Sequence, residues 1–332
     1  MISSGEVLVL DRRQVAERLT LEECIAAVEK ALAAQGRGAR YRSQSLGARV
    51  ERGGFHVKAI VHEQERPWFV AKTNANFPGN PERIGLPTIQ GVLLLFDGET
   101  GRPLAVMDSA EITLLRTAAA TAIAAKHLAR PSSHVVTIAG CGEQGRIHLR
   151  ALRQVLPIDL VYAWDRGACR ADRLAAELSI DLGIEIVPIA DLAEGTRRSQ
   201  VIVTCTPSHE PFLTPQHVMP GTFVGAVGAD HPEKHEIDPR LMAASTVVVD
   251  DIDQCAAMGD LHHALESGDM SRDGVHAELA EIVAGKKPGR TRDREITLFD
   301  STGIALEDAA AAILVFERAS AGDDFRKVAM GA

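Results

Sequence analysis

The stretch from Pro131 to Gly303 alternates short apolar runs with helical patterns, and this alternation restricts the possible folds more than any other feature of the 332-residue chain. The runs are rich in Val and Ile, and they fall at 134–140, 158–165, 184–190, 200–206, 222–228, 245–251 and 295–301. Apolar β-branched strands that are separated by helices are typical of a parallel sheet covered on both faces. We therefore expect an α/β fold in this part of the chain.

The residues before Pro131 have a different pattern of expected secondary structure. A strand is expected at 6–10 and an amphipathic helix at 19–38. Between Gln44 and Asp97, β-rich runs are separated by Gly, Pro and Asn, and this punctuation favours an antiparallel or mixed sheet. A helix rich in small residues then covers 112–129.

The chain is longer than one usual domain, so two domains are expected. The change in the pattern of strands and helices predicts a mixed α+β domain at 1–128 and a second, α/β domain at 129–304. A last apolar helix, within 305–332, either packs back on the first domain or packs against another chain.

The composition restricts the classes of partner that this protein is expected to bind. A formal net charge of −9 disfavours a nucleic-acid partner. No apolar stretch approaches the ~20 residues that a membrane span needs, and the apolar run near the N-terminus is too short for a signal peptide. The cysteines are scattered without CxxC spacing, as expected for free thiols in a reducing compartment. We therefore expect a cytoplasmic protein without a nucleic-acid or membrane partner.

A glycine-rich loop, "IAGCGEQGRIHL", joins the run at 134–140 to a helical pattern. Gly140 permits the tight turn, Gly142 lets the backbone approach a pyrophosphate, and Gly145 lets the helix pack closely on the strand. The first helical turn, with Glu143 and Gln144, presents its backbone N–H groups to the phosphates. This context predicts a Rossmann dinucleotide-binding domain rather than a simple turn between a strand and a helix.

Asp165 stands twenty residues beyond Gly145, at the end of the next expected strand. A carboxylate at this place accepts the ribose hydroxyls and repels a 2′-phosphate, whereas an arginine such as Arg166 accommodates that phosphate. The acid favours NAD(H) over NADP(H).

Three further charged residues are candidate site residues. Lys72 lies in a strand-like run, where it is either a solvated lysine or part of a site. Arg116 stands in an alanine-rich helix, where burial requires a ligand carboxylate or an acidic neighbour. Asp230 follows the run at 222–228, where it either faces the ligand crevice at the strand ends or caps a helix.

Several stretches together resemble the ornithine cyclodeaminase/μ-crystallin family over nearly the whole chain. They are "GLPTIQGVLLLFDGETGRPLAVMD", "ITLLRTAAATAIAAKHLARP", "IAGCGEQGRIHLRAL", "GAVGADHPEKHEID" and "ITLFDSTGIALEDAAAA". Members are NAD(P)-dependent enzymes, namely cyclodeaminases, alanine dehydrogenases, and opine-type, ketimine or imino-acid reductases. The resemblance implies a Rossmann domain joined to a substrate and dimerisation domain, and therefore a homodimer.

The resemblance also implies roles for single residues. Lys72 matches the lysine that holds the substrate carboxylate and polarises the reacting carbon. Arg116 matches an arginine that pairs with the same carboxylate, and Arg42 matches a second one. Asp230 matches the acid that exchanges a proton with the substrate nitrogen. We further expect four residues to contact the cofactor: Thr117, Thr206, Ser301 and Gly303.

The strand before Lys72 departs from the cyclodeaminase pattern. Cyclodeaminases carry a glutamate there that assists ring closure, whereas "FHVKAIV" has His56, Lys58 and no acid. His56 and Lys58 share one face of the strand. They either face solvent or line a site that suits an anionic or neutral substrate group.

The sequence therefore favours an NAD(H)-dependent imino-acid reductase or amino-acid dehydrogenase that transfers a hydride to the α-carbon of a small 2-imino acid. A dicarboxylic substrate, with iminosuccinate giving aspartate, is an extension of this hypothesis. An ornithine cyclodeaminase and a μ-crystallin-like binding protein are the alternatives. His231 and His235 have the spacing of a helical zinc pair, but the stretch has no HExxH pattern. We therefore expect no metal.

Overall fold

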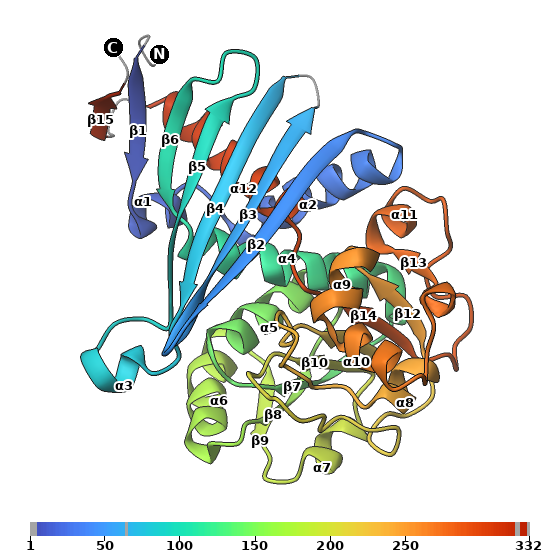
Figure 1. Cartoon of the computed structure of the whole chain (residues 1–332). Coiled ribbons are helices and arrows are strands. Elements are labelled where there is room, and N and C mark those ends of the chain that lie inside the picture. Colours follow the sequence, from blue (N-terminus) through green and yellow to red (C-terminus); the bar gives the residue numbers. More distant parts are fainter. Residues whose placement is uncertain (1–4, 64–65, 323–325, 331–332) are drawn as a thin grey trace. The chain divides into compact units, whose positions relative to one another are not determined.

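The computed structural model describes residues 5–63, 66–322 and 326–330, and the chain forms two compact units (Figure 1). The first unit comprises residues 1–116 and 304–332, and the second comprises residues 117–303. The division falls inside one continuous helix, α4 (Ala110–Leu128), rather than after it as the sequence suggested. No helix in the described ranges has the length and apolar character needed to cross a membrane.

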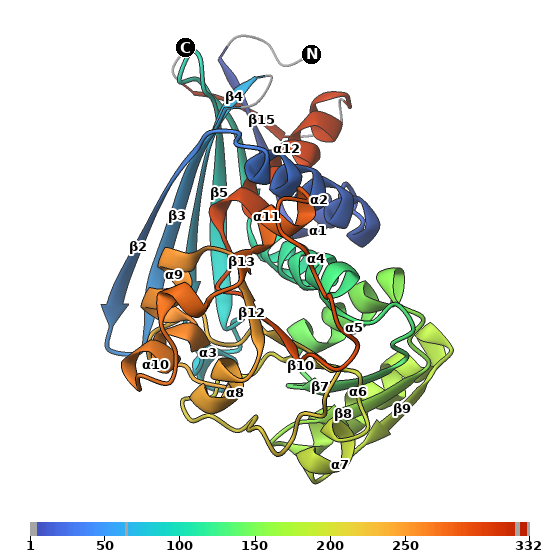
Figure 2. The same ribbon diagram turned by 90° about the vertical axis from the view of Figure 1, so that its right-hand side faces the viewer.

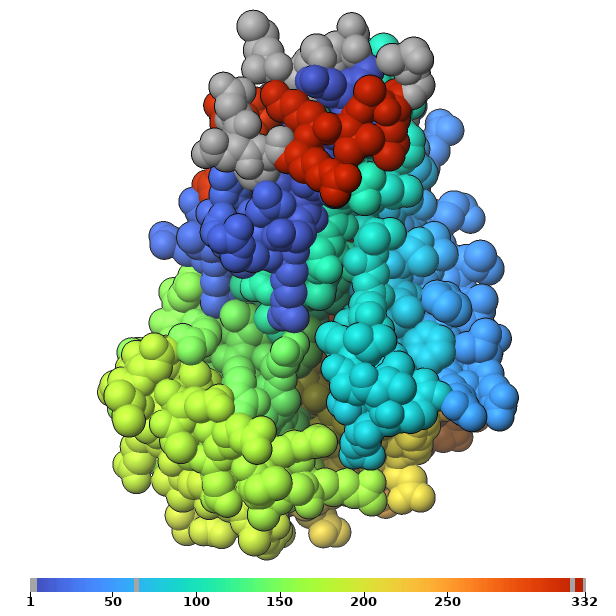
Figure 3. All heavy atoms as spheres, turned by 90° about the vertical axis from the view of Figure 1, so that its left-hand side faces the viewer, coloured from blue at the N-terminus to red at the C-terminus, as the bar shows by residue number. Residues whose placement is uncertain are grey.

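A mixed sheet forms the scaffold of the first unit, with strand order β15-β1-β6-β5-β4-β3-β2. Strands β1 and β6 are parallel and the other neighbours are antiparallel, which confirms the expected mixed sheet. Strand β15, near the C-terminus, pairs with β1, near the N-terminus, and Figure 3 shows red C-terminal atoms against blue N-terminal atoms. The strands are β1 (Glu6–Leu10), β2 (Tyr41–Val50), β3 (Gly53–Glu63), β4 (Pro67–Asn76), β5 (Ile89–Asp97), β6 (Pro103–Asp108) and β15 (Arg326–Ala329).

Two helices, α2 (Leu21–Gly36) and α12 (Ala305–Ser320), lie on one face of this sheet (Figure 2). The sheet residues beneath them are buried and apolar, as in Ile60 of β3 and Val70 of β4. The ring of Trp68 in β4 meets that of Phe316 in α12 with centroids 5.7 Å apart. The C-terminal helix therefore packs on the first unit of its own chain. The unit also contains α1 (Arg12–Ala16) and α3 (Asn80–Ile84).

The second unit is built on a sheet with strand order β13-β12-β14-β11-β10-β7-β8-β9, in which neighbouring strands are parallel. Each of the seven runs expected after Pro131 contains one of these strands, and β10 and β11 are buried throughout. The strands are β7 (Val135–Ala139), β8 (Leu160–Trp164), β9 (Glu185–Pro188), β10 (Val201–Thr204), β11 (Phe223–Ala226), β12 (Thr246–Val249), β13 (Ala277–Glu278) and β14 (Thr297–Asp300).

The strand order of the second unit reverses between β7 and β10, because β7 leads to β8 and β9 on one side while β10 leads to β11 on the other. In open α/β sheets, ligands bind beyond the carboxyl ends of the strands at such a switch point. The helices of this unit are α5 (Glu143–Val155), α6 (Ala168–Leu182), α7 (Leu192–Thr196), α8 (Pro239–Ala243), α9 (Ile252–Met258), α10 (Asp260–Glu266) and α11 (Leu279–Val283).

Candidate active site

Four charged side chains meet on the helix-covered face of the first sheet: Lys72, Arg116, Glu307 and Asp308. Lys72 Nζ lies 2.7 Å from Asp308 Oδ1. The guanidinium of Arg116 reaches both acids, with Nη1 at 2.8 Å from Glu307 Oε2 and Nε at 3.0 Å from Asp308 Oδ1. All four are buried. The interpretation of Lys72 as a solvated lysine is therefore wrong, and Arg116 has the acidic neighbours that its burial requires.

Burial controls the ionisation of this cluster. It lowers the pKa of Lys72 to about 7, although the Asp308 charge acts in the opposite direction. For Asp308, burial alone raises the pKa, but the charges of Lys72 and Arg116 reverse this effect and hold the pKa below its usual value. Asp308 is therefore an anion at neutral pH. A lysine that titrates near neutrality can both hold an anion and exchange a proton.

Lys58 and His56 of β3 belong to the same face of the sheet. In the β3–β4 register, Lys58 is paired with Lys72 and His56 with Asn74, and directly paired residues point to the same side. Both β3 side chains are half-buried. Lys58 also acts electrostatically on Lys72 and on Asp308. The interpretation that these two side chains face open solvent is therefore not supported.

This group contains charges of both signs. Lys58, Lys72 and Arg116 are three cations when Lys72 is protonated, and Glu307 and Asp308 are two carboxylates. A site that contains several cations can take part in binding an anionic ligand.

Polar side chains continue the cluster along β4. Lys72 Nζ lies 3.2 Å from Thr113 Oγ1 of α4, and Asn74 Nδ2 lies 3.4 Å from the same oxygen. Ser109 donates to Asn74 Oδ1 at 2.6 Å. Gly91 leaves room for this contact, since a Cβ there would stand 2.2 Å from Asn74 Oδ1.

Arg42 is not part of this cluster. It is paired with Val61 in the β2–β3 register, three residues along β3 from Lys58, so it lies on the other face of the sheet and is exposed. Glu307 and Asp308 were not among the site residues expected from the sequence. They stand in the first turn of α12, where acidic residues are common because they complement the helix dipole.

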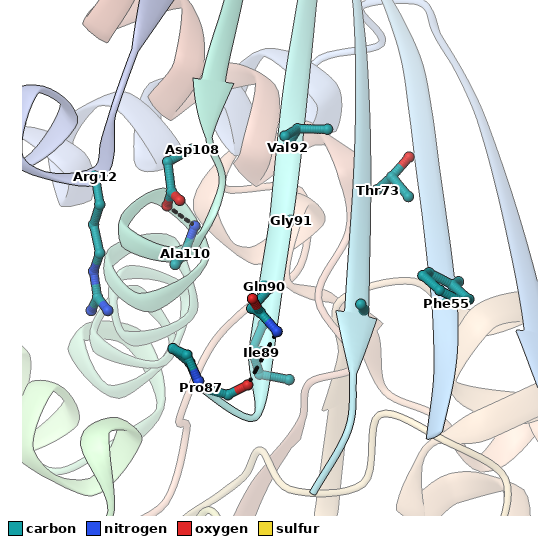
Figure 4. Close-up of a pocket in the computed structure, with 11 residues that line it drawn as sticks. Arg12, Phe55, Thr73, Pro87, Ile89, Gln90, Gly91, Val92, Asp108 and Ala110 are labelled. Atoms are coloured by element: carbon teal, nitrogen blue, oxygen red, sulfur yellow. Dashed lines mark hydrogen bonds between the residues drawn. The ribbon is translucent and has the colours of Figure 1, made fainter. Parts of the chain in front are cut away.

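A shallow pocket of about 490 Å³ opens on the other face of the same sheet (Figure 4). Thr73 and Ala75 of β4 line it, and these residues alternate with Lys72 and Asn74. Its wall includes Phe55, Val92 and Asp108, whose carboxylate accepts a hydrogen bond from the backbone N–H of Ala110. The pocket therefore lies on the face opposite the charged cluster, and we assign it no role in the chemistry.

The glycine loop of the second unit has the geometry of a phosphate-binding turn at the switch point. Gly140 has φ +106°, and a Cβ there would stand 2.7 Å from the carbonyl oxygen of Cys205, which follows β10. A Cβ on Gly145 would stand 2.1 Å from the carbonyl oxygen of Gly140. A Cβ on Gly142 would meet nothing within 4 Å apart from its chain neighbours.

Gly142 therefore borders open space at the start of α5. No hydrogen-bonding side chain caps this helix in the described part of the chain. Its first turn includes Glu143 and Gln144, and the N–H groups at the start of a helix can bind an anion.

Asp165 follows β8 and faces the glycine loop. Its carboxylate accepts hydrogen bonds from the backbone N–H groups of Cys141 and Gly167, each at 2.9 Å. Asp165 is partly buried and Arg166 is exposed. The structure thus brings the acid, but not the neighbouring guanidinium, against the loop.

Asp230 follows β11, and its side chain contacts the Lys234 ammonium while remaining about half exposed. No helix begins at this residue. The next helix, α8, starts at Pro239 and is capped by Asp238. The alternative of Asp230 as a helix cap is therefore wrong, and the residue stands in a loop at the carboxyl end of a central strand.

The other expected cofactor residues surround the strand ends of the second unit. Thr206 follows β10, and Ser301 and Gly303 follow β14. Asp250, at the end of β12, orders the last of these segments by accepting hydrogen bonds from the N–H groups of Thr302 at 2.7 Å and Gly303 at 2.6 Å. Thr117 is buried in α4, directly after Arg116.

Possible metal-ligand atoms gather at one place in the described residues, on α10. Atoms of His262, His263 and Glu266 lie within 4.8 Å of one another. His262 pairs with Glu266 at 3.5 Å, and His263 Nε2 donates to the Lys234 carbonyl at 2.9 Å. These contacts account for the arrangement, and we assign no metal to it. His231 and His235, the pair noted in the sequence, are not in this group.

Known proteins share this fold over nearly the whole chain. An alanine dehydrogenase of Archaeoglobus fulgidus is 37% identical over 314 residues, which are 95% of each chain. An archaeal alanine dehydrogenase solved as a dimer with NAD bound matches with a TM-score of 0.92 and 36% identity, covering 97% of this chain and 99% of that one.

Two further solved structures are similarly close. The Δ1-pyrroline-2-carboxylate reductase of Thermococcus litoralis, in complex with NADH and L-proline, has a TM-score of 0.92 and 33% identity and covers 97% of this chain and 100% of its own. The iminosuccinate reductase of Paracoccus denitrificans, in complex with NAD⁺, has a TM-score of 0.90 and 30% identity. The match covers 98% of this chain and 100% of the reductase chain. The profile of one family matches residues 6–323, and the chain belongs to the ornithine cyclodeaminase/mu-crystallin family.

Proposed function

We propose that this chain is an NAD(H)-dependent oxidoreductase that interconverts a 2-imino acid and the corresponding amino acid by hydride transfer at the α-carbon. The buried cluster of Lys72 and Arg116 carries this proposal, because it places two cations side by side where they can bind a carboxylate. The glycine loop and the activities of the similar enzymes agree with it.

The residues of the second unit fit NAD(H). Gly142 leaves open space beside the uncapped start of α5, which suits a pyrophosphate. The Asp165 carboxylate would accept the ribose hydroxyls and would repel a 2′-phosphate, so we expect NADH to be used in preference to NADPH. When bound, the nicotinamide donates or accepts the hydride.

The protein's own contribution is placement and electrostatics. Lys72 and Arg116 would hold the substrate carboxylate and orient the C=N bond. Orientation of this kind contributes several kcal/mol to barrier lowering. Asp230 would keep the imine nitrogen protonated, which makes the α-carbon more electrophilic.

We further propose that the substrate is dicarboxylic, with iminosuccinate giving aspartate. Lys58, opposite Lys72, adds a positive charge that a substrate with one carboxylate would not use fully. The same charge disfavours the cationic amine tail of ornithine. A cyclodeaminase is therefore the weaker alternative, although it shares the family. A purely ligand-binding role would not require a lysine that titrates near neutrality.

We also propose that the protein is a homodimer, as the archaeal alanine dehydrogenase is. Size-exclusion chromatography with light scattering tests this, and a monomer would contradict it.

The activity test is loss of NADH absorbance with pyruvate, oxaloacetate or glyoxylate in the presence of ammonia or methylamine. We expect the highest kcat/KM with oxaloacetate plus ammonia, and L-aspartate as the product. Release of ammonia from ornithine without net change in NADH would replace this proposal with the cyclodeaminase. NADH binding with no turnover on any of these substrates would favour the binding role.

A further inference from the structure

Glu236 is a fully buried carboxylate that the proposed chemistry does not use. Its Oε1 accepts hydrogen bonds from the backbone N–H of Thr206 at 2.6 Å and from the Thr206 hydroxyl at 2.7 Å. Its Oε2 accepts from the backbone N–H of Gly228 at 2.8 Å and from the Thr204 hydroxyl at 2.8 Å. One side chain therefore connects the end of β10, the segment that follows it and the segment that follows β11.

These contacts close the loop that carries Asp230. The bond between Gly228 and Glu236 joins the first and last residues of the segment 228–236, which we call the acid loop. Gly228 makes this closure possible, because a Cβ there would stand 2.4 Å from the Glu236 carboxyl carbon. The backbone N–H of His235 also donates to the Ser208 carbonyl at 2.9 Å. Glu236, the last residue of the acid loop, and His235 before it are thus both hydrogen-bonded to the segment after β10.

A second set of carboxylates holds Glu236 in turn. Asp260 Oδ1 accepts hydrogen bonds from the backbone N–H groups of Glu236 at 2.8 Å and Ile237 at 2.9 Å. Asp300, the last residue of β14, accepts from the N–H of Leu261 at 2.9 Å. Gly259 leaves room for Asp300, since a Cβ there would stand 2.5 Å from its Oδ2. The base of the acid loop is therefore connected through buried side chains to the end of β14.

The donors to the Glu236 carboxylate are neutral hydroxyl and backbone groups, and burial raises the pKa of this residue. Burying a carboxyl group among neutral donors is costly, and the four hydrogen bonds that it accepts offset this cost only in part. What the buried Glu236 carboxylate provides in exchange is a fixed geometry of the acid loop.

We propose that Glu236 is a positioning residue, which fixes the acid loop so that Asp230 is presented to the substrate nitrogen. This proposal rests on the proposed function, since it assumes that Asp230 is the acid. Glu236 itself touches neither the substrate nor the cofactor in this scheme. Its removal should lower kcat by a larger factor than it raises the Kd for NADH, because Glu236 also holds Thr206, an expected cofactor residue.

Glu236→Gln is the sharpest variant, because each carboxylate oxygen accepts a hydrogen bond from a backbone N–H. An amide of the same size must turn its NH2 group toward one of these donors, so one bond is lost and one contact becomes repulsive. Misplacement of a catalytic group by about 1 Å costs about 100-fold in rate. We expect kcat to fall by about that factor.

Glu233→Gln is the matched control, because Glu233 is an exposed acid in the same loop. It should keep kcat within about twofold of wild type, as surface substitutions usually do. Melting temperature and the Kd for NADH are measured for every variant, so that loss of fold is distinguished from loss of position.

A double-mutant cycle with Asp230→Asn separates positioning from general damage. If Glu236 acts through Asp230, the double variant has the kcat of Asp230→Asn alone. Effects that multiply, or a kcat of Glu236→Gln equal to wild type, would overturn the positioning role while leaving the proposed function intact. An Asp230→Asn variant with wild-type kcat would instead overturn the assignment of Asp230, and the positioning role with it.

If Glu236→Gln does not fold, Thr204→Val takes its place in the cycle. It removes the hydroxyl that donates to Glu236 Oε2 and keeps the size of the side chain. We expect a smaller fall in kcat, about 5- to 10-fold for one hydrogen bond, that disappears in the Asp230→Asn background. A fall that persists there would contradict the proposal.

Discussion

Lys58 and Lys72 are directly paired on the antiparallel strands β3 and β4, on the same face of the sheet. Like charges in this position repel each other. Asp308, at 2.7 Å from Lys72, offsets the repulsion only in part, because it is shared with Arg116. An anionic ligand beside the two lysines would reduce this repulsion further. The pairing of the two lysines therefore supports a dicarboxylic substrate in the proposed reaction.

Lys58→Met should reduce the preference for a dicarboxylic substrate. A hydrogen bond to a charged group contributes about 1.5–3 kcal/mol, so the ratio of kcat/KM for oxaloacetate over pyruvate, each with ammonia, should fall by about tenfold or more. Lys286→Met, an exposed lysine of the second unit, removes the same charge elsewhere and should leave this ratio unchanged. An unchanged ratio in Lys58→Met would remove the case for a dicarboxylic substrate.

Asp308→Asn should destabilise the protein strongly. It takes the shared partner from two buried cations, and breaking a buried ion pair from one side costs about 3–5 kcal/mol. Urea unfolding at about pH 6, below the Lys72 pKa of about 7, measures this cost while Lys72 is charged. Asp253→Asn is the comparison, because Asp253 pairs with Arg272 at 2.7 Å on the surface and should cost at most about 1 kcal/mol. Equal losses in the two variants would contradict a stabilising role for the cluster.

Binding of a carboxylate should weaken as pH rises through neutrality. Burial lowers the pKa of Lys72 from 10.5 to about 7, so the side chain is charged below about pH 7 and increasingly neutral above it. Only the charged form attracts an anion, so the inhibition constant of succinate should rise by up to about tenfold per pH unit above pH 7. Succinate is suitable because it is fully ionised over this range and is not reduced.

Lys72→Arg provides the control for this pH dependence. An arginine remains charged throughout the accessible range, so the inhibition constant should become nearly independent of pH. The same rise of the inhibition constant in Lys72→Arg would show that another group controls binding.

The sequence predicted the parallel sheet of the second unit well, because its strands are buried on both faces and read as continuous Val- and Ile-rich runs. It did not predict β2 as a separate strand. Most of that strand is exposed, and its residues, YRSQSLGARV, show no apolar alternation. Strand β15 is short and pairs with β1 from the opposite end of the chain, so no local pattern identifies it.

The charged cluster was predictable only in part. The sequence showed that Arg116 needs an acid if it is buried, but its partner Glu307 is 191 residues away. Asp308 is separated from Lys72 by 236 residues. A single sequence contains no signal for such pairings, and the two acids have the positions of ordinary residues in a first helical turn. Glu236 was equally hidden, because its hydrogen bonds join loops whose contact depends on the whole sheet.

Two alanine substitutions in the glycine loop should separate cofactor binding from folding. Gly142 has φ −78° and ψ −161°, a conformation open to any residue, and a Cβ there meets no protein atom within 4 Å beyond its chain neighbours. Gly142→Ala should therefore fold normally, while its methyl group enters the space proposed for the pyrophosphate. At an overpacking cost of about 1–3 kcal/mol, the Kd for NADH should rise about 5- to 150-fold. Gly145→Ala should instead lower the melting temperature, since its Cβ would stand 2.1 Å from the Gly140 carbonyl oxygen. NADH fluorescence titration and thermal unfolding of both variants measure the two effects. Wild-type affinity for NADH in a folded Gly142→Ala would place the pyrophosphate away from this loop.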